Sequence, residues 1–514
     1  MTIEQYKKLD SCHFEFSMDQ PCQEEEIEAR LLLGSNRFDL YAILLYIDHR
    51  VRGVHDMTYA TNVYKERTRV MTGQKFSEKG NSEKNNFSDF INSLDKLIAD
   101  FQNGQFDYRR TYIPVDKDYS LIDGAHRVAC AAYFGKKLKI LRFTDISVHH
   151  MTSEVLLSNF MPVTIADAMA LEALQWHDNL FMLILWPKAT ADQSKNNEAL
   201  QCIHSQLDVI YEKKCVMSHH AIRNLMLQIY GHMEWVGNLD NDYESTYLKA
   251  DQVWESKGGC RFILVQAPDK EYVLNIKSQV RAIYDIGLSS VHSTDNHRET
   301  ALTANAIYNP NSFHFLHIAR PTKYKKSYKL FLAFVNALEV NQAIKKNFII
   351  DSSMVLAICG GRSANDLDYY KLTGSPDLRL DKDYVDCIEE HDEYQKKFYD
   401  VPIDDLINIP SNYFSFNEIK FVSLENLLKF KQNRYQCHHD GKDNADIKLI
   451  SLLLSDKDNK WQRWLIACNT AYRRKCRMLK RDYYNTRNRL LDIIGIYEPL
   501  KQIKGNLRQK GFIK

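Results

Sequence analysis

The stretch FIIDSSMVLAICGGRSANDLDYYKL (residues 348–372) decides how the C-terminal half of the chain folds. An apolar run ends at Asp351, two serines follow, and the helix-forming segment MVLAIC stops at a glycine pair. A further stretch then carries Asp366 and Asp368. The order of these features predicts a strand, a short helix capped by the serines, and a second strand.

The two aspartates of the second strand are the first candidate site. Residues two apart on a strand point to the same face, so we expect the carboxylates of Asp366 and Asp368 to lie together. Such carboxylates repel each other unless a cation lies between them, and oxygen ligands favour Mg²⁺. Mg²⁺ held there could bridge a nucleoside triphosphate during phosphoryl transfer. The alternative is a solvated edge strand without a ligand, which is a common arrangement.

This pattern resembles the signature of the polymerase-β-like nucleotidyltransferase superfamily, h-G-[G/S] followed by D-h-[D/E]-h. The resemblance implies a nucleotidyltransferase-like fold that binds Mg²⁺ and a nucleoside triphosphate, either ATP or CTP. It implies that Asp366 and Asp368 are catalytic and hold the metal. It also implies that Ser352, Ser353 and Arg362 bind the phosphates.

Two features depart from the family pattern. Serines replace the glycines; their hydroxyls can donate to phosphate, but they leave the backbone less free to approach it. The third catalytic carboxylate is also not obvious. The segment PIDDLINIP (402–410) offers Asp404 or Asp405 on an expected strand, and we assign Asp405.

The segment 419–453 resembles the closing part of bacterial members of the same superfamily. A strand is followed by a Ser-Leu-Glu helix and then by Lys-Asp and Asp-Ile. The family residues map onto Lys431, Arg434, Lys442, Asp443 and Asp446.

A second motif, LIDGAHRVACAAYFG (121–135), reads as a strand, a turn and the start of a helix. The free N–H groups of that helix, with His126 and Arg127, would form an anion pocket suited to phosphate. The alternative is that both side chains face solvent. The motif resembles D-G-x-H-R-x-x-A of the ParB/sulfiredoxin fold, which implies phosphate contacts for Gly124, His126 and Arg127 and a turn shaped by Asp123.

Between these motifs, residues 289–319 gather several metal-ligand residue types. A metal site or a substrate site is possible there, but Asn296 with Glu299 also fits a helix capping box, so the polarity can be local. The candidate ligands are His292, Asp295, His297, His314 and His317.

Composition limits the class of protein. The 514 residues are 44% hydrophobic and 26% charged, as in ordinary globular proteins. We expect no transmembrane helix and no secretory signal, because no apolar run is long enough. The eleven cysteines form no C-x-x-C pair, so we expect reduced thiols and a cytoplasmic protein.

The charge of the chain is unevenly distributed. From residue 460 to 514 about fifteen Lys and Arg stand against three Asp and Glu, although the whole chain has a net charge of +2. With Trp461, Trp464 and Leu465 at helical spacing, this tail predicts either a peripheral contact with an anionic membrane or a helix packed on the protein. Nucleic-acid binding is disfavoured because the rest of the chain is net acidic.

The expected fold class is α/β (α+β) and multidomain. We expect a helical N-terminal extension (1–59), a ParB/sulfiredoxin-like domain (60–150), a mixed α/β middle region (151–300), a nucleotidyltransferase-like domain with a mixed sheet (301–455) and a basic helical tail (456–514).

The whole chain resembles bacterial proteins associated with surface-polysaccharide loci. The resemblance implies an Mg²⁺-dependent nucleotidyl- or phosphotransferase in capsule or O-antigen biosynthesis, acting on a sugar-phosphate or glycan acceptor at the inner face of the membrane. Two alternatives remain open: a nucleotide-binding regulatory or scaffold protein without turnover, and a ParB-like DNA-binding or nuclease protein.

Overall fold

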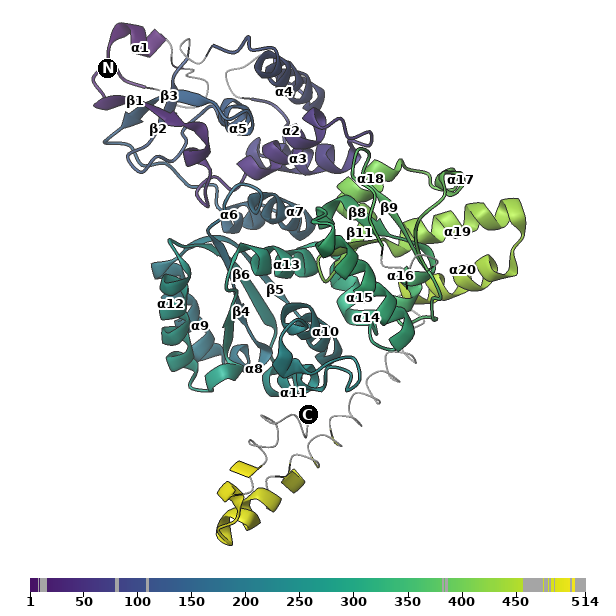
Figure 1. The fold of residues 1–514 in the computed structure, drawn as a ribbon. Coiled ribbons are helices and arrows are strands. Elements are labelled where there is room, and N and C mark those ends of the chain that lie inside the picture. The colour runs from purple at the N-terminus through teal and green to yellow at the C-terminus, as the bar shows by residue number, and fades with distance from the viewer. Residues whose placement is uncertain are drawn as a thin grey trace.

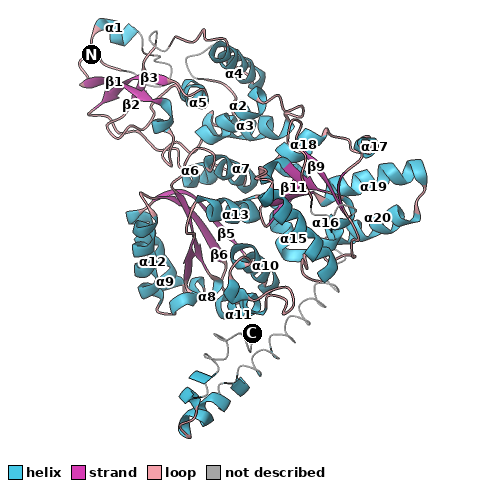
Figure 2. Ribbon diagram, viewed as in Figure 1, coloured by secondary structure: helices cyan, strands magenta, loops and turns pink. Residues whose placement is uncertain are grey.

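The fold is described from a computed structural model of the 514-residue chain. The structure describes residues 1–7, 9, 16–78, 83–107, 111–380, 383 and 387–455, and within the C-terminal segment 475, 479, 482–484, 486–499 and 502–503. Three small sheets, each with its own helices, form a mixed α/β protein with three units (Figures 1 and 2).

The N-terminal unit contains a three-stranded sheet in the order β1-β3-β2. Strand β1 pairs antiparallel with β3, whereas β2 runs parallel to β3. The strands are β1 (Cys22–Glu28), β2 (Ile113–Val115) and β3 (Lys137–Phe143). The helices around them are α2 (Leu40–Val51), α3 (Thr58–Met71), α4 (Phe87–Gln102) and α5 (Ala125–Tyr133). Because β1 and α2 belong to this unit, residues 1–59 are not a separate helical extension, and the expected boundary at residue 59 is wrong.

The central unit contains a four-stranded antiparallel sheet in the order β5-β6-β4-β7. Its strands are β4 (Leu180–Leu185), β5 (Asp208–Cys215), β6 (Cys260–Gln266) and β7 (Val291–Ser293). Helices α9 (Gln193–Gln206) and α12 (Lys270–Tyr284) pack together on one face, which gives a β-α-β-β-α-β order. Two further helices, α10 (His219–Tyr230) and α11 (Glu244–Val253), lie between β5 and β6 in the chain.

The C-terminal unit contains a five-stranded mixed sheet in the order β10-β9-β8-β12-β11. Its strands are β8 (Phe348–Ile350), β9 (Leu367–Lys371), β10 (Ile388–Glu390), β11 (Tyr413–Phe416) and β12 (Ile419–Val422). The main helices are α14 (Pro310–Ile318), α15 (Lys325–Val340), α16 (Ser352–Ile358), α18 (Ile403–Asn408), α19 (Leu424–His438) and α20 (Gly441–Leu454). Strand β8 is antiparallel to β9, and β10 is parallel to β9.

Two helices join the three units. Helix α7 (Val163–Ala173) packs against α2 and α3 of the N-terminal unit and against β5 of the central one, and α13 (His297–Tyr308) packs against both α7 and β11 (Figure 1). Polar contacts also cross these boundaries, for example the ion pair between Arg298 and Glu418. Among the described residues, no helix has the length and apolar character needed to cross a membrane.

Candidate functional site

The carboxylates predicted from the sequence lie at one edge of the C-terminal sheet. Asp351 directly follows β8, Asp366 directly precedes β9, and Asp368 is the second residue of β9. The parallel register of β9 and β10 places Glu389 directly beside Asp368, so both side chains point to the same face of the sheet. The structure therefore brings Asp366 and Asp368 together and adds Glu389, which we did not identify from the sequence.

The carboxyl groups at this edge are close enough that the charge of each affects the ionisation of the others. Burial and the neighbouring charges of Asp366, Asp351 and Glu389 raise the pKa of Asp368 to about 7, while Lys431 acts in the opposite direction. Asp368 therefore gives up its proton readily only near neutral pH. A bound cation would relieve the repulsion and favour the ionised form.

The turn between β8 and α16 has an unusual backbone conformation. Ser352 has φ +56°, in the left-handed region that favours glycine. Ser353 donates from its hydroxyl to the carboxylate of Asp366 at 2.8 Å, while Ser352 lies 3.4 Å from His391 Nε2. The serines therefore stand beside the carboxylates, as the motif predicts. The predicted capping is wrong, because Asp351 is the N-cap residue and makes no side-chain capping bond.

We expect Ser352→Gly to raise the free energy of unfolding by about 0.5–1 kcal/mol, because glycine adopts positive φ without steric strain. Urea denaturation of the purified variant measures this change. Ser353→Gly, whose backbone is helical, is the matched control and should lower stability instead. A loss of stability in Ser352→Gly equal to that of the control would contradict the argument.

Cationic side chains from α19 and from the loop after α16 lie next to the carboxylate edge. Lys431 is buried and contacts Asp443 at 3.1 Å and Asp446 at 3.2 Å. Arg362 binds Asp446 through two nitrogens, and Arg434 binds Asp443 in the same bidentate way. Three cations thus share two carboxylates, which leaves an excess positive charge close to the site. Lys442, by contrast, contributes only a backbone N–H to Asp440.

Asp351 is fully buried at the base of this edge. Its Oδ1 accepts a hydrogen bond from the Tyr399 hydroxyl at 2.5 Å, and its Oδ2 lies 3.6 Å from His391 Nε2. Oδ2 has no hydrogen-bond partner among the described residues. A buried carboxylate oxygen without a partner is costly, so the site favours an additional cation or donor.

Mg²⁺ fits this donor set in part. The described residues contain no group of three or more His, Cys, Asp or Glu side chains arranged to hold a metal by themselves. However, Mg²⁺ commonly binds to one or two carboxylates and takes its other ligands from water and substrate phosphates. Asp366 and Asp368 match that requirement, and the mutual repulsion at Asp368 gives the physical reason for a cation there.

Asp405 does not reach the carboxylate edge as expected. The segment PIDDLINIP forms helix α18, not a strand, and the carboxylate of Asp405 accepts the backbone N–H groups of His55 and Asp56. Asp404 accepts from Thr373, just after β9. The assignment of Asp405 as the third catalytic carboxylate is therefore wrong, and Glu389 occupies the better position.

The histidine-rich segment does not form a shared site in the structure. His292 lies in β7 and contacts Glu299 at 3.0 Å, whereas His314 lies in α14 and donates to the carbonyl of Leu453. Asp295 pairs with Lys270. Asn296 accepts the N–H of Glu299, which is one half of the predicted capping box, whereas the Glu299 carboxylate accepts the N–H of Asp295 and not that of Asn296. In the tail, Trp461, Trp464 and Leu465 lie outside the described residues.

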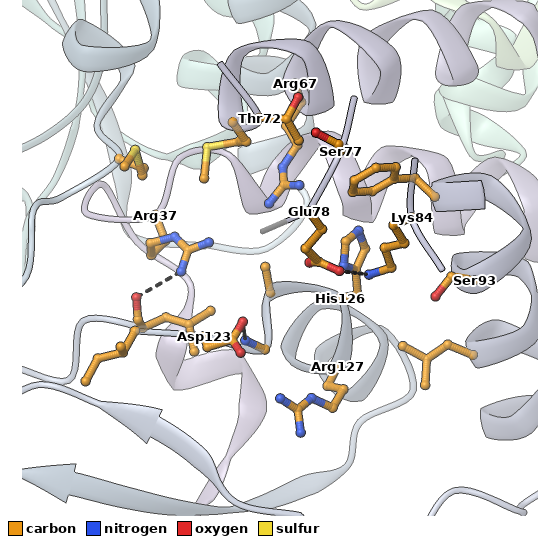
Figure 3. A pocket seen from close by; sticks show the side chains of 18 of the residues that line it. Arg37, Arg67, Thr72, Ser77, Glu78, Lys84, Ser93, Asp123, His126 and Arg127 are labelled. Atoms are coloured by element: carbon orange, nitrogen blue, oxygen red, sulfur yellow. Dashed lines mark hydrogen bonds and ion pairs between the residues drawn. The ribbon is translucent and has the colours of Figure 1, made fainter. Parts of the chain in front are cut away.

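A second candidate site is a cavity of about 660 Å³ in the N-terminal unit, lined by Asp123, Gly124, His126 and Arg127 (Figure 3). Gly124 has φ +91° and begins α5, and an added Cβ would meet Ile113 at 2.8 Å, so only glycine fits this turn. The carboxylate of Asp123 accepts the N–H of Gly124. The motif therefore forms the predicted turn and helix at the wall of a pocket, whereas the predicted strand is reduced to a single bridge between Leu121 and Val115.

The structure adds two arginines to this pocket. The guanidinium groups of Arg37 and Arg67 project toward the cavity (Figure 3). Both bind the fully buried Asp39. Burial alone would raise the pKa of Asp39, but the two guanidinium groups hold it well below its usual range. Two cations on one anion leave a net positive charge at the wall, which favours an anionic ligand.

His126 takes a different role from the one expected. Its Nε2 shares a hydrogen bond with the Tyr64 hydroxyl at 2.8 Å. Burial, with the nearby charges of Arg67 and Lys84, lowers the pKa of His126 well below its usual value. The imidazole is therefore neutral at pH 7 and packs at the base of α5. A cationic contact from His126 to phosphate is not supported, while Arg37 and Arg67 supply the positive charge.

We expect Arg67→Gln to weaken binding of ATP, measured by calorimetry in EDTA, by at least about tenfold, since a charge-assisted hydrogen bond contributes about 1.5–3 kcal/mol. Arg69→Gln is the matched control, because Arg69 lies on the same helix but pairs with Glu66 away from the cavity. Equal loss in both variants would show that the effect is not specific to the pocket.

Comparisons of this chain with protein-family models, with curated proteins and with solved structures found no match. The function is therefore inferred from the geometry and charge of the two sites.

Proposed function

We propose that the protein is an Mg²⁺-dependent nucleotidyl- or phosphotransferase whose reaction takes place at the carboxylate edge of the C-terminal sheet. The observation that carries the proposal is the convergence of Asp366, Asp368 and Glu389 on one face, with the pKa of Asp368 raised to about 7 by burial and its neighbours. Perturbed carboxylates of this kind concentrate at functional sites.

Each residue has a role that follows from its position. Asp366 and Asp368 would hold Mg²⁺, which when bound supplies charge neutralisation for a triphosphate. The hydroxyls of Ser352 and Ser353 can donate to phosphate oxygens. Glu389 is the remaining carboxylate on this face and can accept the proton of the attacking hydroxyl.

These groups account for each bond and proton in the reaction. The acceptor oxygen forms a bond to phosphorus, its proton passes to Glu389, and the phosphoanhydride bond breaks so that its electron pair leaves with pyrophosphate or a nucleoside diphosphate. The excess positive charge of Arg362, Lys431 and Arg434 favours the leaving anion. We propose a sugar-phosphate or glycan acceptor in surface-polysaccharide assembly; this part of the proposal is supported by the sequence resemblance alone.

The proposal is tested by incubating the protein with Mg²⁺ and ATP or CTP, with and without sugar phosphates, and searching for products by mass spectrometry. Formation of a nucleotidylated or phosphorylated product that requires Mg²⁺ supports it. The proposal would be contradicted if no product formed with any of these acceptors and no nucleotide was consumed.

A second candidate function is nucleotide binding without turnover. It is favoured by Ser352, which stands in a left-handed conformation where the family pattern has glycine, and by the absence of a complete metal-ligand set among the described residues. In that case calorimetry would show nucleotide binding while no product forms.

A further inference from the structure

The two candidate sites lie in different units, but one short helix connects their surroundings. Helix α18 packs against β8 and β9, the strands that carry the carboxylate edge. From the same helix, Asp405 reaches the loop between α2 and α3 of the N-terminal unit. The two sites are far apart in the sequence, but α18 contacts the surroundings of both.

The contact made by Asp405 is buried and specific. Its side chain is 2% exposed, and its carboxylate accepts the consecutive N–H groups of His55 at 3.2 Å and Asp56 at 2.9 Å. Hydrogen bonds to a buried charge contribute more than neutral ones, and leaving the charge without donors is costly. Arg52 also binds Asn408, which fixes the two ends of α18 to the same loop.

The loop leads directly into the basic pocket. Asp56 accepts the N–H of Thr58, the first residue of α3, and α3 then carries Arg67 to the pocket wall. Tyr64 binds His126, and Arg67 binds Asp39. A helix of 14 residues transmits a displacement along its axis because its backbone hydrogen bonds keep it stiff.

On the other side, α18 is tied to the strand of the carboxylate edge. Asp404 accepts both the backbone N–H and the hydroxyl of Thr373, which follows β9. Asp368 lies on that strand. A shift of α18 would thus move the end of β9 and the loop before α3 together.

We propose that Asp405 couples the two sites, so that an anion in the basic pocket stabilises α18 and with it the carboxylate edge. This inference rests on the proposed function for the role of the carboxylate edge, but its test does not require turnover. Binding in the basic pocket fixes Arg67 and α3, and the bonds from His55 and Asp56 to Asp405 extend that order to α18. Coupling through ordering gives positive cooperativity between two ligands.

The test is hydrogen–deuterium exchange on the full chain carrying Asp366→Asn and Asp368→Asn, with ATP in EDTA as the probe. Metal-dependent binding at the carboxylate edge is removed, which directs the nucleotide to the basic pocket. We expect slower exchange at residues 121–128, at His55 and Asp56, and, by about fivefold, in α18.

Two further variants of that chain separate coupling from local folding. Adding Asp405→Asn should keep the protection at 121–128 and remove it in α18, because the amide side chain accepts only one of the two N–H groups. Asp404→Asn is the control, because Asp404 lies in the same helix but contacts Thr373 of its own C-terminal unit. Adding it should leave the protection of 121–128 and of α18 unchanged. If Asp405→Asn lowers the melting temperature too far, Asn408→Ala, which removes only the Arg52 contact, provides the second uncoupling variant.

Protection of 121–128 with no change in α18 would overturn the proposal. So would protection of α18 that survives both Asp405→Asn and Asn408→Ala. These outcomes differ from failure of the proposed function, which would show as absence of Mg²⁺-dependent product in the wild-type protein while the exchange pattern remains as expected.

Discussion

Asp366→Asn should reduce Mg²⁺-dependent turnover of ATP or CTP by about a thousandfold or more, because the metal loses one of its two protein carboxylates. The fold should be retained, since Asp366 is exposed and its only described side-chain partner is the hydroxyl of Ser353. Product formation is measured by mass spectrometry under saturating nucleotide.

The control for this experiment is Asp377→Asn. Asp377 follows the same strand, is exposed and pairs with Lys371. Its replacement changes the charge by the same amount without touching the carboxylate edge. If Asp366→Asn and Asp377→Asn had equal turnover, the reaction would not take place at the carboxylate edge.

Asp368→Asn should stabilise the metal-free protein at pH 8 by about 1–2 kcal/mol while abolishing turnover. The sign follows from the pKa, which is about 7 in the folded protein and about 3.8 unfolded. The folded state therefore binds the proton more tightly, and the repulsion destabilises the wild-type protein increasingly as pH rises from about 4 through 7. The size of the effect is reduced because Asp368 is partly exposed to solvent.

Urea denaturation at pH 5 and pH 8 in EDTA measures this effect. At pH 5 Asp368 is protonated in the folded protein but largely ionised in the unfolded chain, so the variant should already be the more stable, by less than half of its advantage at pH 8. At pH 8 the variant should be the more stable of the two. Excess Mg²⁺ should stabilise only the wild type and narrow the difference. A pH-independent difference would contradict the pKa argument.

The elements that follow from local pattern were predicted well. The apolar run before Asp351 appears as β8, and the helix after the Asp-Gly turn appears as α5. Asp366 and Asp368 stand together because the two-residue period of a strand is a local property. The segment around Asp405 was misassigned although its acidic first turn after a proline is typical of a helix start.

The rest of both sites depends on contacts between distant parts of the chain. Glu389 reaches Asp368 only because β10 pairs with β9, and no local pattern specifies that register. Arg37 and Arg67 meet at Asp39 from two different elements. His126 reads as a cation in the sequence, but burial beside Tyr64 makes it neutral. Burial and tertiary pairing, which a single sequence does not display, decided each of these cases.

A crystal structure of the protein soaked with Mn²⁺ and a non-hydrolysable ATP analogue would locate the metal and the nucleotide. We expect an anomalous peak within about 2.3 Å of carboxylate oxygens of Asp366 and Asp368, with the phosphates beside Ser352 and Ser353. A metal found elsewhere, with the carboxylate edge empty at saturating Mn²⁺, would contradict this expectation.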